Sequence, residues 1–404
     1  MKFQFLSLLF CLALLLAMIG CSGRTADPDF STEGSRTGSK TESPGTSGVV
    51  PEPETESNLR VVSMNVRMDL LPKVGNRLDN RSENRIRAVR EQILSYEPDL
   101  IGLQEDVQRW IDNINIDPGL YTVYRPDVTM SMHTQEYCSI YVKNGVKVKD
   151  SGWKWLTSDG TDKTVTLTYA ELTDGDGKYD MSAKDLSELG IRNDATLKTS
   201  YTGPNGNNGT YNYGPKLAAR LMNWVIVEIN GETVIYINTH LQNRGYNNRE
   251  YSEHPLYMLR YYERCAQMDR VNEQAELLKA QHPGASVIVT ADFNDTSKSG
   301  FYEKATETYL DAMKVAEAGT KLENSWNAAY DNDRQGQGYV SPNENQVSGR
   351  IDFCLLSKNL EGCVARYRLG ACKWVLDEDA TLVKNVNVYP SDHLPIIVDL
   401  RIGT

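Results

Sequence analysis

The sequence predicts an α/β fold in which mixed β-sheets are covered by helices, rather than a doubly wound parallel sheet. Apolar runs rich in β-branched residues alternate with segments of helical period beyond about residue 58. Asn144-Gly145 and Asn230-Gly231 each separate two short apolar runs, which is typical of hairpins. A long helix is expected from Pro255, a favourable first-turn residue, to about Ala280. Hairpins combined with helical crossovers favour mixed sheets.

The expected elements follow one another in a regular order. A helix is expected at Glu83–Ser95, where apolar residues recur at helical spacing. Ser286–Asp295 begins with a run of apolar and β-branched residues, so a buried strand is expected there, ending on Asp292 and Asn294. The other expected strands are Arg60–Met64, Leu100–Leu103, Cys138–Val142, Val146–Lys149, Trp224–Ile229, Val234–Asn238, Ile351–Leu356 and Ile396–Leu400.

Residues 1–21 have the pattern of a targeting signal. Lys2 precedes an apolar core, Phe3–Ile19, which is too short and too close to the N-terminus for a membrane span. The core runs into Gly20 and Cys21, which resembles a bacterial lipoprotein signal whose cysteine becomes the acylated first residue. We expect an extracytoplasmic protein, anchored in a bacterial envelope membrane by a lipid on Cys21 and facing the periplasm or the cell surface. Plain secretion with cleavage nearby is the alternative.

Residues 22–57 and 58–404 differ in composition. The first range holds Ser, Thr, Gly, Pro and Glu with almost no large apolar residue, so a disordered, solvated tether is expected. The second contains no further linker or repeat and is expected to form one large domain. Insertions near 158–214 and 330–348 are rich in Gly, Asn, Asp and Tyr, and form either exposed loops or walls of an active-site cleft. The first contains an acidic triplet whose spacing can hold calcium, Asp174, Asp176 and Asp180.

Charge and cysteine content argue against some classes of function. The formal net charge is −11 at pH 7, and loss of Lys2 with the signal makes it more negative. An acidic protein lacks the overall field that gathers polyanions, which counts against a general nucleic-acid binder. The cysteines beyond Cys21 are odd in number and lack a CxxC spacing, so neither complete internal pairing nor a zinc site is expected. Cys363 and Cys372 can pair across a short loop, or stay unpaired in the core.

Polar side chains gather where six of the expected strands begin or end. Taken singly, each is explained as a turn residue, a cap or a structurally satisfied histidine. As a set, their carboxylate and amide oxygens suit Mg²⁺ or Mn²⁺, and histidine beside carboxylate suits acid–base work at neutral pH. Hydrolysis of a phosphate ester needs this combination. The set is Asn65, Gln104, Glu105, Asn238, Thr239, His240, Asp292, Asn294, Asp352, Ser391, Asp392 and His393.

The same segments resemble the motifs of a known family. SMN, LIGLQE, INTHL, ADFN, GRIDF and SDHLPI occur in this order, and together they resemble the endonuclease/exonuclease/phosphatase superfamily over about Arg60 to Leu400. The resemblance implies a four-layer α/β sandwich, in which two packed mixed β-sheets are flanked by helices. It also implies a Mg²⁺- or Mn²⁺-dependent hydrolase of phosphate esters.

The resemblance assigns roles to individual residues. Glu105 corresponds to the principal metal ligand, with Asn65 beside it and Asp392 as a further group on the metal side. The catalytic set is His393, oriented by Asp352, with Asp292 to orient water or a proton and His240 as a phosphate ligand or general acid. The substrate-binding set is Asn294 and Asn65, which would bind phosphoryl oxygens, and Arg220, which would face the cleft. Glu136 is expected to be structural or near the metal.

Two positions depart from the family pattern. Ala291 stands where glycine is frequent, a small change that should not prevent chemistry. Gln242 stands where an acidic residue is frequent, and an insertion carrying Arg244, Arg249 and His254 follows it. These departures leave the metal site intact and put the identity of the substrate in doubt.

The sequence therefore predicts a metal-dependent phosphoesterase with two open substrate classes. One is DNA or RNA, and the other is a lipid head group or another small phosphodiester. The absence of a basic stripe interleaved with aromatic residues slightly favours the second. The alternative from another class is a non-catalytic surface lipoprotein that binds a phosphorylated ligand or a glycan through the tyrosines of its insertions. No obligate protein partner is expected.

Overall fold

A computed structural model describes residues 56–68, 82–128, 136–157, 166–189, 199–202, 208–211, 220–243, 255–297, 299–319, 322–323, 350–371, 374–378, 384–388, 390–391 and 393–403. These residues all belong to one unit of the chain, Glu54–Thr404. The predicted signal 1–21, nearly all of the predicted tether 22–57, the insertion 330–348, Cys372 and Asp392 lie outside the described residues.

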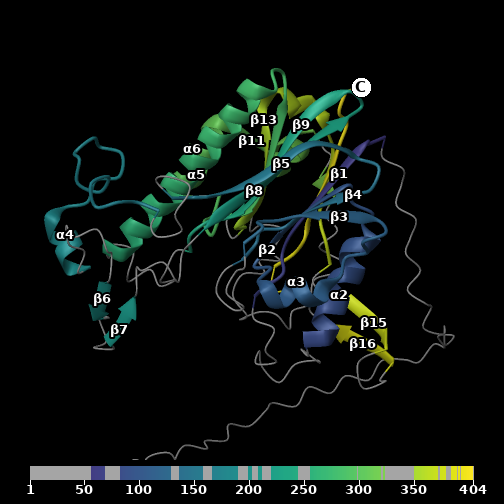
Figure 1. The fold of residues 1–404 in the computed structure, drawn as a ribbon, viewed down its shortest axis with the longest axis horizontal. Coiled ribbons are helices and arrows are strands. Elements are labelled where there is room, and N and C mark those ends of the chain that lie inside the picture. Colours follow the sequence, from purple (N-terminus) through teal and green to yellow (C-terminus); the bar gives the residue numbers. More distant parts are fainter. Residues whose placement is uncertain are drawn as a thin grey trace, which may run out of the picture. The chain divides into compact units, whose positions relative to one another are not determined.

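Seven strands form the larger sheet, in the order β12-β14-β17-β1-β2-β4-β3 (Figure 1). The sheet is mixed, because β1 pairs in parallel with β2 and antiparallel with β17. The parallel pairing brings Asn65, at the end of β1, beside Gln104, at the end of β2. The strands are β1 Leu59–Asn65, β2 Leu100–Gln104, β3 Tyr121–Tyr124, β4 Ile140–Lys143, β12 Leu322–Glu323, β14 Val364–Leu369 and β17 Ile396–Leu400.

Six strands form the second sheet, in the order β11-β13-β10-β9-β8-β5. β10 pairs in parallel with β9 and antiparallel with β13, and the register aligns Asp292 with His240 on one side and with Asp352 on the other. Three candidate catalytic residues therefore form one row across neighbouring strands. The strands are β5 Lys147–Trp155, β8 Leu221–Ile229, β9 Glu232–His240, β10 Ser286–Asp292, β11 Tyr309–Asp311 and β13 Asp352–Ser357. Two small sheets pair β6 Thr199–Thr202 with β7 Asn208–Tyr211, and β15 Trp374–Glu378 with β16 Lys384–Val388.

Helices cover the outer faces of the two large sheets. A buried apolar cluster joins their facing sides, with Leu100 and Val398 from one sheet and Ile288 and Leu356 from the other. α5 and α6 pack on the outer face of the six-stranded sheet, and α2 and α3 on that of the seven-stranded sheet. The four-layer α/β sandwich predicted from the sequence is thus confirmed. The helices are α2 Ser82–Ser95, α3 Gln108–Ile114, α4 Ala183–Glu188, α5 Pro255–Gln281, α6 Gly300–Thr308, α7 Ala312–Ala318 and the 3-10 turn Lys358–Cys363.

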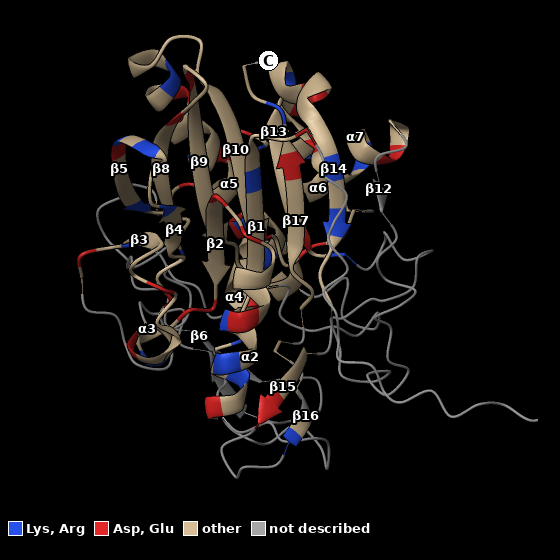
Figure 2. Ribbon diagram, turned by 90° about the vertical axis from the view of Figure 1, so that its right-hand side faces the viewer, with Lys and Arg blue, Asp and Glu red and all other residues tan. Residues whose placement is uncertain are grey.

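Most residues in the strands of the two large sheets are uncharged, as the tan ribbons of Figure 2 show. An exception lies on β1, β14 and β17, where Arg60 and Arg366 lie 2.6 and 2.7 Å from the carboxylate of Asp399. Asp399 is fully buried, so its charge needs such partners.

A polar seam joins the two sheets next to the apolar core. Asn238 of β9 donates from Nδ2 to the carbonyl oxygens of Leu103, at 2.8 Å, and Cys138, at 3.0 Å. Its Oδ1 accepts from Gln104 Nε2 at 2.6 Å. Gly102 on β2 faces this seam, and a Cβ there would lie 2.4 Å from the hydroxyl oxygen of Tyr236 and 2.6 Å from Asn238 Oδ1. Only glycine lets the two sheets approach this closely.

The two Asn-Gly turns have different roles. Asn230-Gly231 joins β8 to β9 as predicted, with φ of 49° and 83°, the positive pair that a type I′ hairpin turn requires. The predicted hairpin around Asn144-Gly145 is wrong, because β4 pairs with β2 and β3 while β5 pairs with β8. That turn carries the chain from one sheet to the other.

The first insertion is only partly the loop that its composition suggests. Within residues 166–189, Leu167, Leu172, Tyr179 and Leu186 are buried in the cluster that contains α5 and the six-stranded sheet. Tyr179 also donates a hydrogen bond to Asp269 of α5. In the part of the chain that the structure describes, every helix is too short or too polar to cross a membrane.

Candidate active site

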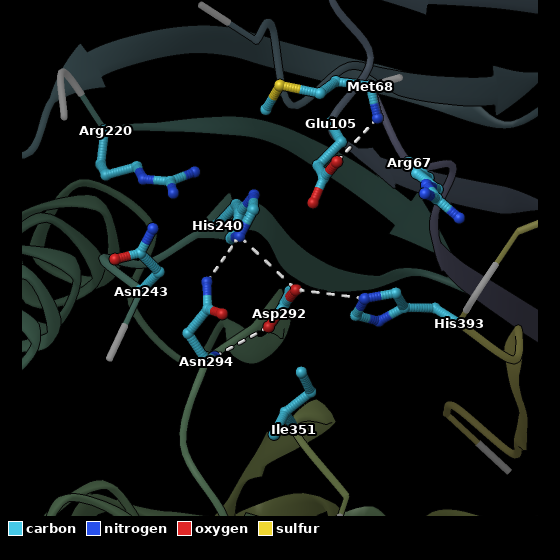
Figure 3. Close-up of a pocket in the computed structure, with 10 residues that line it drawn as sticks. All are labelled: Arg67, Met68, Glu105, Arg220, His240, Asn243, Asp292, Asn294, Ile351 and His393. Atoms are coloured by element: carbon cyan, nitrogen blue, oxygen red, sulfur yellow. Dashed lines mark hydrogen bonds and ion pairs between the residues drawn. The ribbon is translucent and has the colours of Figure 1, made fainter. Parts of the chain in front are cut away.

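A pocket of about 260 Å³ lies where the ends of β1, β2, β9 and β10 converge (Figure 3). Parallel strands place their carboxyl ends at one edge, and ligands in α/β folds usually bind at such an edge. The pocket is lined by Arg67, Met68, Glu105, Arg220, His240, Asn243, Asp292, Asn294, Ile351 and His393.

Asn65 joins the two central carboxylates. Its amide Nδ2 lies 3.0 Å from Glu105 Oε1 and 2.9 Å from Asp292 Oδ2, and donates to both. Its Oδ1 accepts from the backbone N–H of Arg67 at 2.8 Å. The second oxygen of Glu105 accepts from the N–H of Met68 at 2.7 Å. Asn65 thus presents its amide nitrogen to the carboxylates. To bind a metal ion there, the side-chain amide would have to rotate so that Oδ1 faces the carboxylates.

Asp292 occupies the centre of the row across β9, β10 and β13 and is buried. Burial and the charge of Asp352 raise its pKa above the ordinary value, against the lowering effect of His240 and His393. Its Oδ1 accepts from the backbone N–H of Asn294 at 2.8 Å, which fixes the carboxylate in the strand end. A buried carboxylate in this state is stabilised by any added cation.

His240 is held between a carboxylate and an amide. Its Nδ1 lies 2.8 Å from Glu136 Oε2, and its Nε2 lies 2.7 Å from Asn294 Nδ2, which also donates to the Leu241 carbonyl oxygen at 3.0 Å. A carboxylate accepts and an amide nitrogen donates, so the ring has its proton on Nδ1 and accepts at Nε2. Burial and Arg220 lower the pKa of His240, but the carboxylates of Glu136 and Asp292 outweigh them and raise it above its ordinary value.

Glu136 ties several parts of the site together. It accepts from the guanidinium of Arg220, from His240, and from the backbone N–H of Glu105 at 2.6 Å. Burial alone raises the pKa of Glu136, but the charges of His240 and Arg220 prevail and lower it to about 2. Glu136 is therefore an anion at any pH where the protein works, and it orients one residue from each large sheet. Arg220 is buried beside it, and its Nε has no hydrogen-bond partner among the described residues.

His393 forms the second histidine–carboxylate pair. Its Nδ1 lies 2.7 Å from Asp352 Oδ2, so Nδ1 donates to the carboxylate and Nε2 faces Asp292 Oδ2 at 3.9 Å. The backbone N–H of His393 donates to Ser391 Oγ at 3.1 Å, and that hydroxyl donates to the carbonyl oxygen of Asn65 at 2.6 Å. His393 is thus held to one sheet through its ring and to the other through its backbone.

The donor set fits a divalent cation. Ligand atoms of Glu105, His240 and Asp292 lie within 4.8 Å of one another, as do those of Asp292, Asp352 and His393. Oxygen donors outnumber nitrogen donors in each group, which suits Mg²⁺ or Mn²⁺ better than zinc. Glu105 and Asp292, the two carboxylates among the described residues that line the pocket, also supply the negative charge that such an ion neutralises.

Most of the residues predicted from sequence meet in this pocket. Gln104 and Asn238 do not line it and instead join the two sheets. Asp392 lies outside the described residues, so its place on the metal side stays a prediction. The residues that line the pocket or contact its lining are Asn65, Glu105, Glu136, Arg220, His240, Asp292, Asn294, Asp352 and His393.

Sequence reasoning missed Arg67, Met68, Asn243 and Ile351. Arg67, Met68 and Asn243 lie within three residues of a recognised motif, and Ile351 lies inside GRIDF without having been assigned a role. An unusual backbone conformation marks Arg67 and two of the predicted residues. Arg67 has a φ of 60°, and Glu105 and Asn294 have φ of 61° and 52°, in the left-handed region that non-glycine residues rarely adopt. Such strain is typical of functional sites and costs on the order of 1 kcal/mol per residue.

Asp106, next to Glu105, gives a prediction about stability. Its carboxyl group is fully buried, and Oδ1 has no hydrogen-bond partner among the described residues. Burial raises its pKa to about 7. Because the folded state holds this proton more tightly than the unfolded state, the free energy of unfolding should fall as the pH rises from about 4 to about 7.

The variant Asp106→Asn has no such proton. We expect it to be more stable than the wild type at pH 8 by roughly 2 to 4 kcal/mol, and to lose this advantage near pH 4. Urea unfolding at both pH values measures the difference, with exposed Asp112→Asn as the control. Identical pH dependence in the wild type and Asp106→Asn would contradict the expectation.

Comparisons with known proteins agree with this geometry. Among curated protein sequences, none matches the chain. A solved structure described as an endonuclease/exonuclease/phosphatase from Bacteroides vulgatus matches with a TM-score of 0.51 and 17% identity, covering 85% of this chain and 98% of that one. A protein of the same description from Bacteroides thetaiotaomicron matches with a TM-score of 0.51 and 16% identity, covering 85% and 97%. At these identities the likeness shows the fold.

The family model supplies the identification. The model of the endonuclease/exonuclease/phosphatase family matches residues 62–393, which is most of the chain and includes every strand end that borders the pocket. The chain belongs to the endonuclease/exonuclease/phosphatase family.

Proposed function

We propose that this protein is a divalent-metal-dependent phosphoesterase that hydrolyses its substrate by attack of water. The family comprises hydrolases of phosphate esters. The observation that supports the proposal best is the row His240, Asp292 and Asp352, which places two histidine–carboxylate pairs on either side of one central carboxylate. A ligand-binding protein has no need for two such pairs. A cation bound by Glu105 and Asp292 would neutralise phosphoryl oxygens and stabilise the leaving oxygen.

His393 and Asp292 would prepare the attacking water. Asp352 holds the proton of His393 on Nδ1, which leaves Nε2 as an acceptor on the pocket side. A water between Nε2 and Asp292 Oδ2 is oriented by two acceptors, since these atoms are 3.9 Å apart. His393 can then take a proton from the water as it attacks phosphorus, and Asp352 stabilises the resulting imidazolium.

Asn294, Arg220 and His240 would bind the phosphoryl group. Asn294 and Arg220 both present N–H groups to the pocket, and the Arg220 guanidinium has already lost most of its water. Such donors stabilise the charge that develops on phosphoryl oxygens. Once the Asn294 amide has moved to the substrate, His240, whose pKa is raised, can take up a proton on Nε2 and act as a donor. It would then serve the leaving oxygen or a phosphate oxygen.

Two substrate classes use this chemistry, DNA or RNA and small or lipid phosphodiesters. Nicking of supercoiled plasmid by the purified protein separates them. Nicking in Mg²⁺ that is lost in His393→Ala would establish a nuclease. Hydrolysis of bis(4-nitrophenyl) phosphate without nicking would direct the search to lipid head groups and small esters. Binding of a phosphorylated ligand without Mg²⁺ and without product would favour the non-catalytic lipoprotein.

Removal of divalent cations is expected to abolish hydrolysis. With EDTA the rate for bis(4-nitrophenyl) phosphate should fall to the uncatalysed level, and excess Mg²⁺ or Mn²⁺ should restore it. Mg²⁺ should also raise the Tm by several degrees, because it binds only the folded carboxylate pair. Glu105→Gln should lose this rise in Tm, and the exposed variant Glu273→Gln should keep it. Full activity of the metal-free protein would contradict the proposal.

We also propose that the protein acts outside the cytoplasm, anchored by a lipid on Cys21. The targeting pattern of residues 1–21 supports this. Metabolic labelling with a clickable fatty acid should mark the wild type, and Cys21→Ala should lose the label. Labelling of the variant, or none of the wild type, would leave plain secretion.

A further inference from the structure

Helix α5 has a stripe of buried polar residues on one face, and several of them contact the loops that follow β9 and β10. Its members recur at i, i+3, i+4 and i+7, so they share one face. Helix faces that are buried in globular proteins are normally apolar, and buried ionic groups seldom improve stability over apolar ones. A contribution to stability therefore does not explain why these polar residues are buried on α5. It consists of Arg260, Glu263, Arg264 and Gln267, which are 7%, 4%, 0% and 0% exposed.

Arg264 contacts both loops that meet at the phosphate-binding side of the pocket. Its Nε and Nη2 lie 3.1 and 2.9 Å from Asp295 Oδ2, and its Nη1 lies 3.4 Å from the carbonyl oxygen of Gln242. Asp295 directly follows Asn294, and Gln242 directly follows Leu241. One guanidinium thus joins the loop after β10 to the loop after β9.

Gln267 and Glu263 hold the second of these loops in place. Gln267 Oε1 accepts from the backbone N–H of Gln242 at 2.8 Å, and Glu263 Oε2 accepts from the Gln242 side-chain amide at 3.1 Å. Gln267 Nε2 also donates to Thr166 Oγ1 at 2.9 Å, at the described start of the insertion. The backbone N–H, the carbonyl oxygen and the side-chain amide nitrogen of Gln242 all contact residues of α5. Gln242 is 1% exposed. Gln242, where the sequence departs from the family pattern, therefore contacts α5 and is not among the residues that line the pocket.

The two fixed loops meet at Asn294. Its amide Nδ2 lies 3.0 Å from the Leu241 carbonyl oxygen and 2.7 Å from His240 Nε2. A shift of either loop changes both distances at once, because Leu241 precedes Gln242 and Asn294 precedes Asp295. The contact between Asn294 and His240 is the one that the substrate must replace.

We infer that Arg264 and Gln267 are positioning residues, which set the place of Asn294 against His240 by fixing the two loops to α5. The inference rests on the proposed phosphoesterase function, because those two groups matter most when a phosphoryl oxygen lies between them. A misplacement of about 1 Å at such a site can cost about a hundredfold in rate.

Gln267→Met tests this with little change in volume. It removes the contact to the N–H of Gln242 and leaves the helix apolar at that position. With bis(4-nitrophenyl) phosphate and Mg²⁺, we expect kcat to fall about 10- to 100-fold while KM changes by less than about threefold. Val271→Ala, one turn further along α5 and also buried, is the control for a general loss of stability and should keep kcat.

Arg264→Lys supplies a second variant if Gln267→Met does not fold. It keeps a cation beside Asp295 and gives up the contact with the Gln242 carbonyl oxygen, so kcat should fall about 3- to 10-fold relative to the wild type. Unchanged kcat in every folded variant of Arg264 and Gln267 would overturn the inference, as would an equal fall in Val271→Ala.

A spectroscopic measurement separates this inference from the proposed function. In metal-free protein, the ¹⁵N resonances of the His240 ring report a protonated Nδ1 and an Nε2 that accepts from Asn294, and His240→Gln assigns them among the five histidines. Gln267→Met should shift the Nε2 resonance and Val271→Ala should not. An inactive wild type with this shift would refute the phosphoesterase and keep the positioning, whereas an active enzyme without the shift would refute the positioning alone.

Discussion

Replacement of Asp292 by asparagine is expected to lower kcat/KM for phosphodiester hydrolysis by about a thousandfold. Asp292 contacts Asn65 and the backbone of Asn294 and faces both histidines. The proposed mechanism therefore gives it a part in metal binding, water orientation and proton transfer. Asparagine keeps the shape and removes the charge.

The same substitution should not weaken the fold. Burial raises the pKa of Asp292, which means that its charged form destabilises the protein, and a neutral amide avoids this cost. We therefore expect a Tm equal to or above that of the wild type at pH 8, together with the loss of activity. Asp269→Asn changes a carboxylate of α5 that is not among the residues lining the pocket, and this variant should keep its activity. Activity of Asp292→Asn within tenfold of the wild type would remove this residue from the mechanism.

Replacement of His393 by alanine is expected to lower the rate of hydrolysis about as much, because in the proposed mechanism this residue accepts the proton of the attacking water. The rate should fall by about a thousandfold with little change in KM. The reason for a small effect on KM is that His393 acts when charge develops and is not needed to hold the ground state. Steady-state kinetics with bis(4-nitrophenyl) phosphate at several pH values gives both constants.

His282→Ala and Asp352→Asn are the controls for His393. His282 directly follows α5 and is not among the residues that line the pocket, so its loss should leave the rate unchanged. Asp352→Asn keeps the ring of His393 but favours the wrong tautomer, because an amide can donate to Nδ1 where the carboxylate could only accept. We expect an intermediate loss of rate. A larger loss in Asp352→Asn than in His393→Ala would contradict the assigned roles.

Local signals in the sequence predicted the strands well. β10 and β9 were found because four or more buried apolar residues run between clear turn residues, and Asn230-Gly231 fixes its hairpin through backbone geometry alone. The same dipeptide at 144–145 led to the wrong prediction of a hairpin, because the turn itself does not determine which strands pair. Pairing of β5 with β8 depends on contacts between residues far apart in sequence, which a single sequence does not display.

The site was predictable where chemistry and strand ends coincide. Glu105, Asp292 and His240 combine a reactive side chain with a position at the end of a buried strand. Arg67 offered no such combination. Its backbone has a φ of 60°, a conformation that an arginine in the sequence does not predict. The buried stripe on α5 was also hidden, since Arg264 and Gln267 look like the solvated face of a helix until their partners are known.

The absence of a side chain at Gly102 affects the spacing between the two sheets, and the proposed catalytic cluster depends on that spacing. Glu105 and Asn65 are carried by one sheet, and His240, Asp292 and Asp352 by the other, so the reactive cluster exists only while the two halves stay in register. The missing side chain at Gly102 sets the closest approach of those halves. The distance between the two halves of the cluster is therefore set inside the sandwich, by the packing of one sheet against the other, and not at the pocket itself.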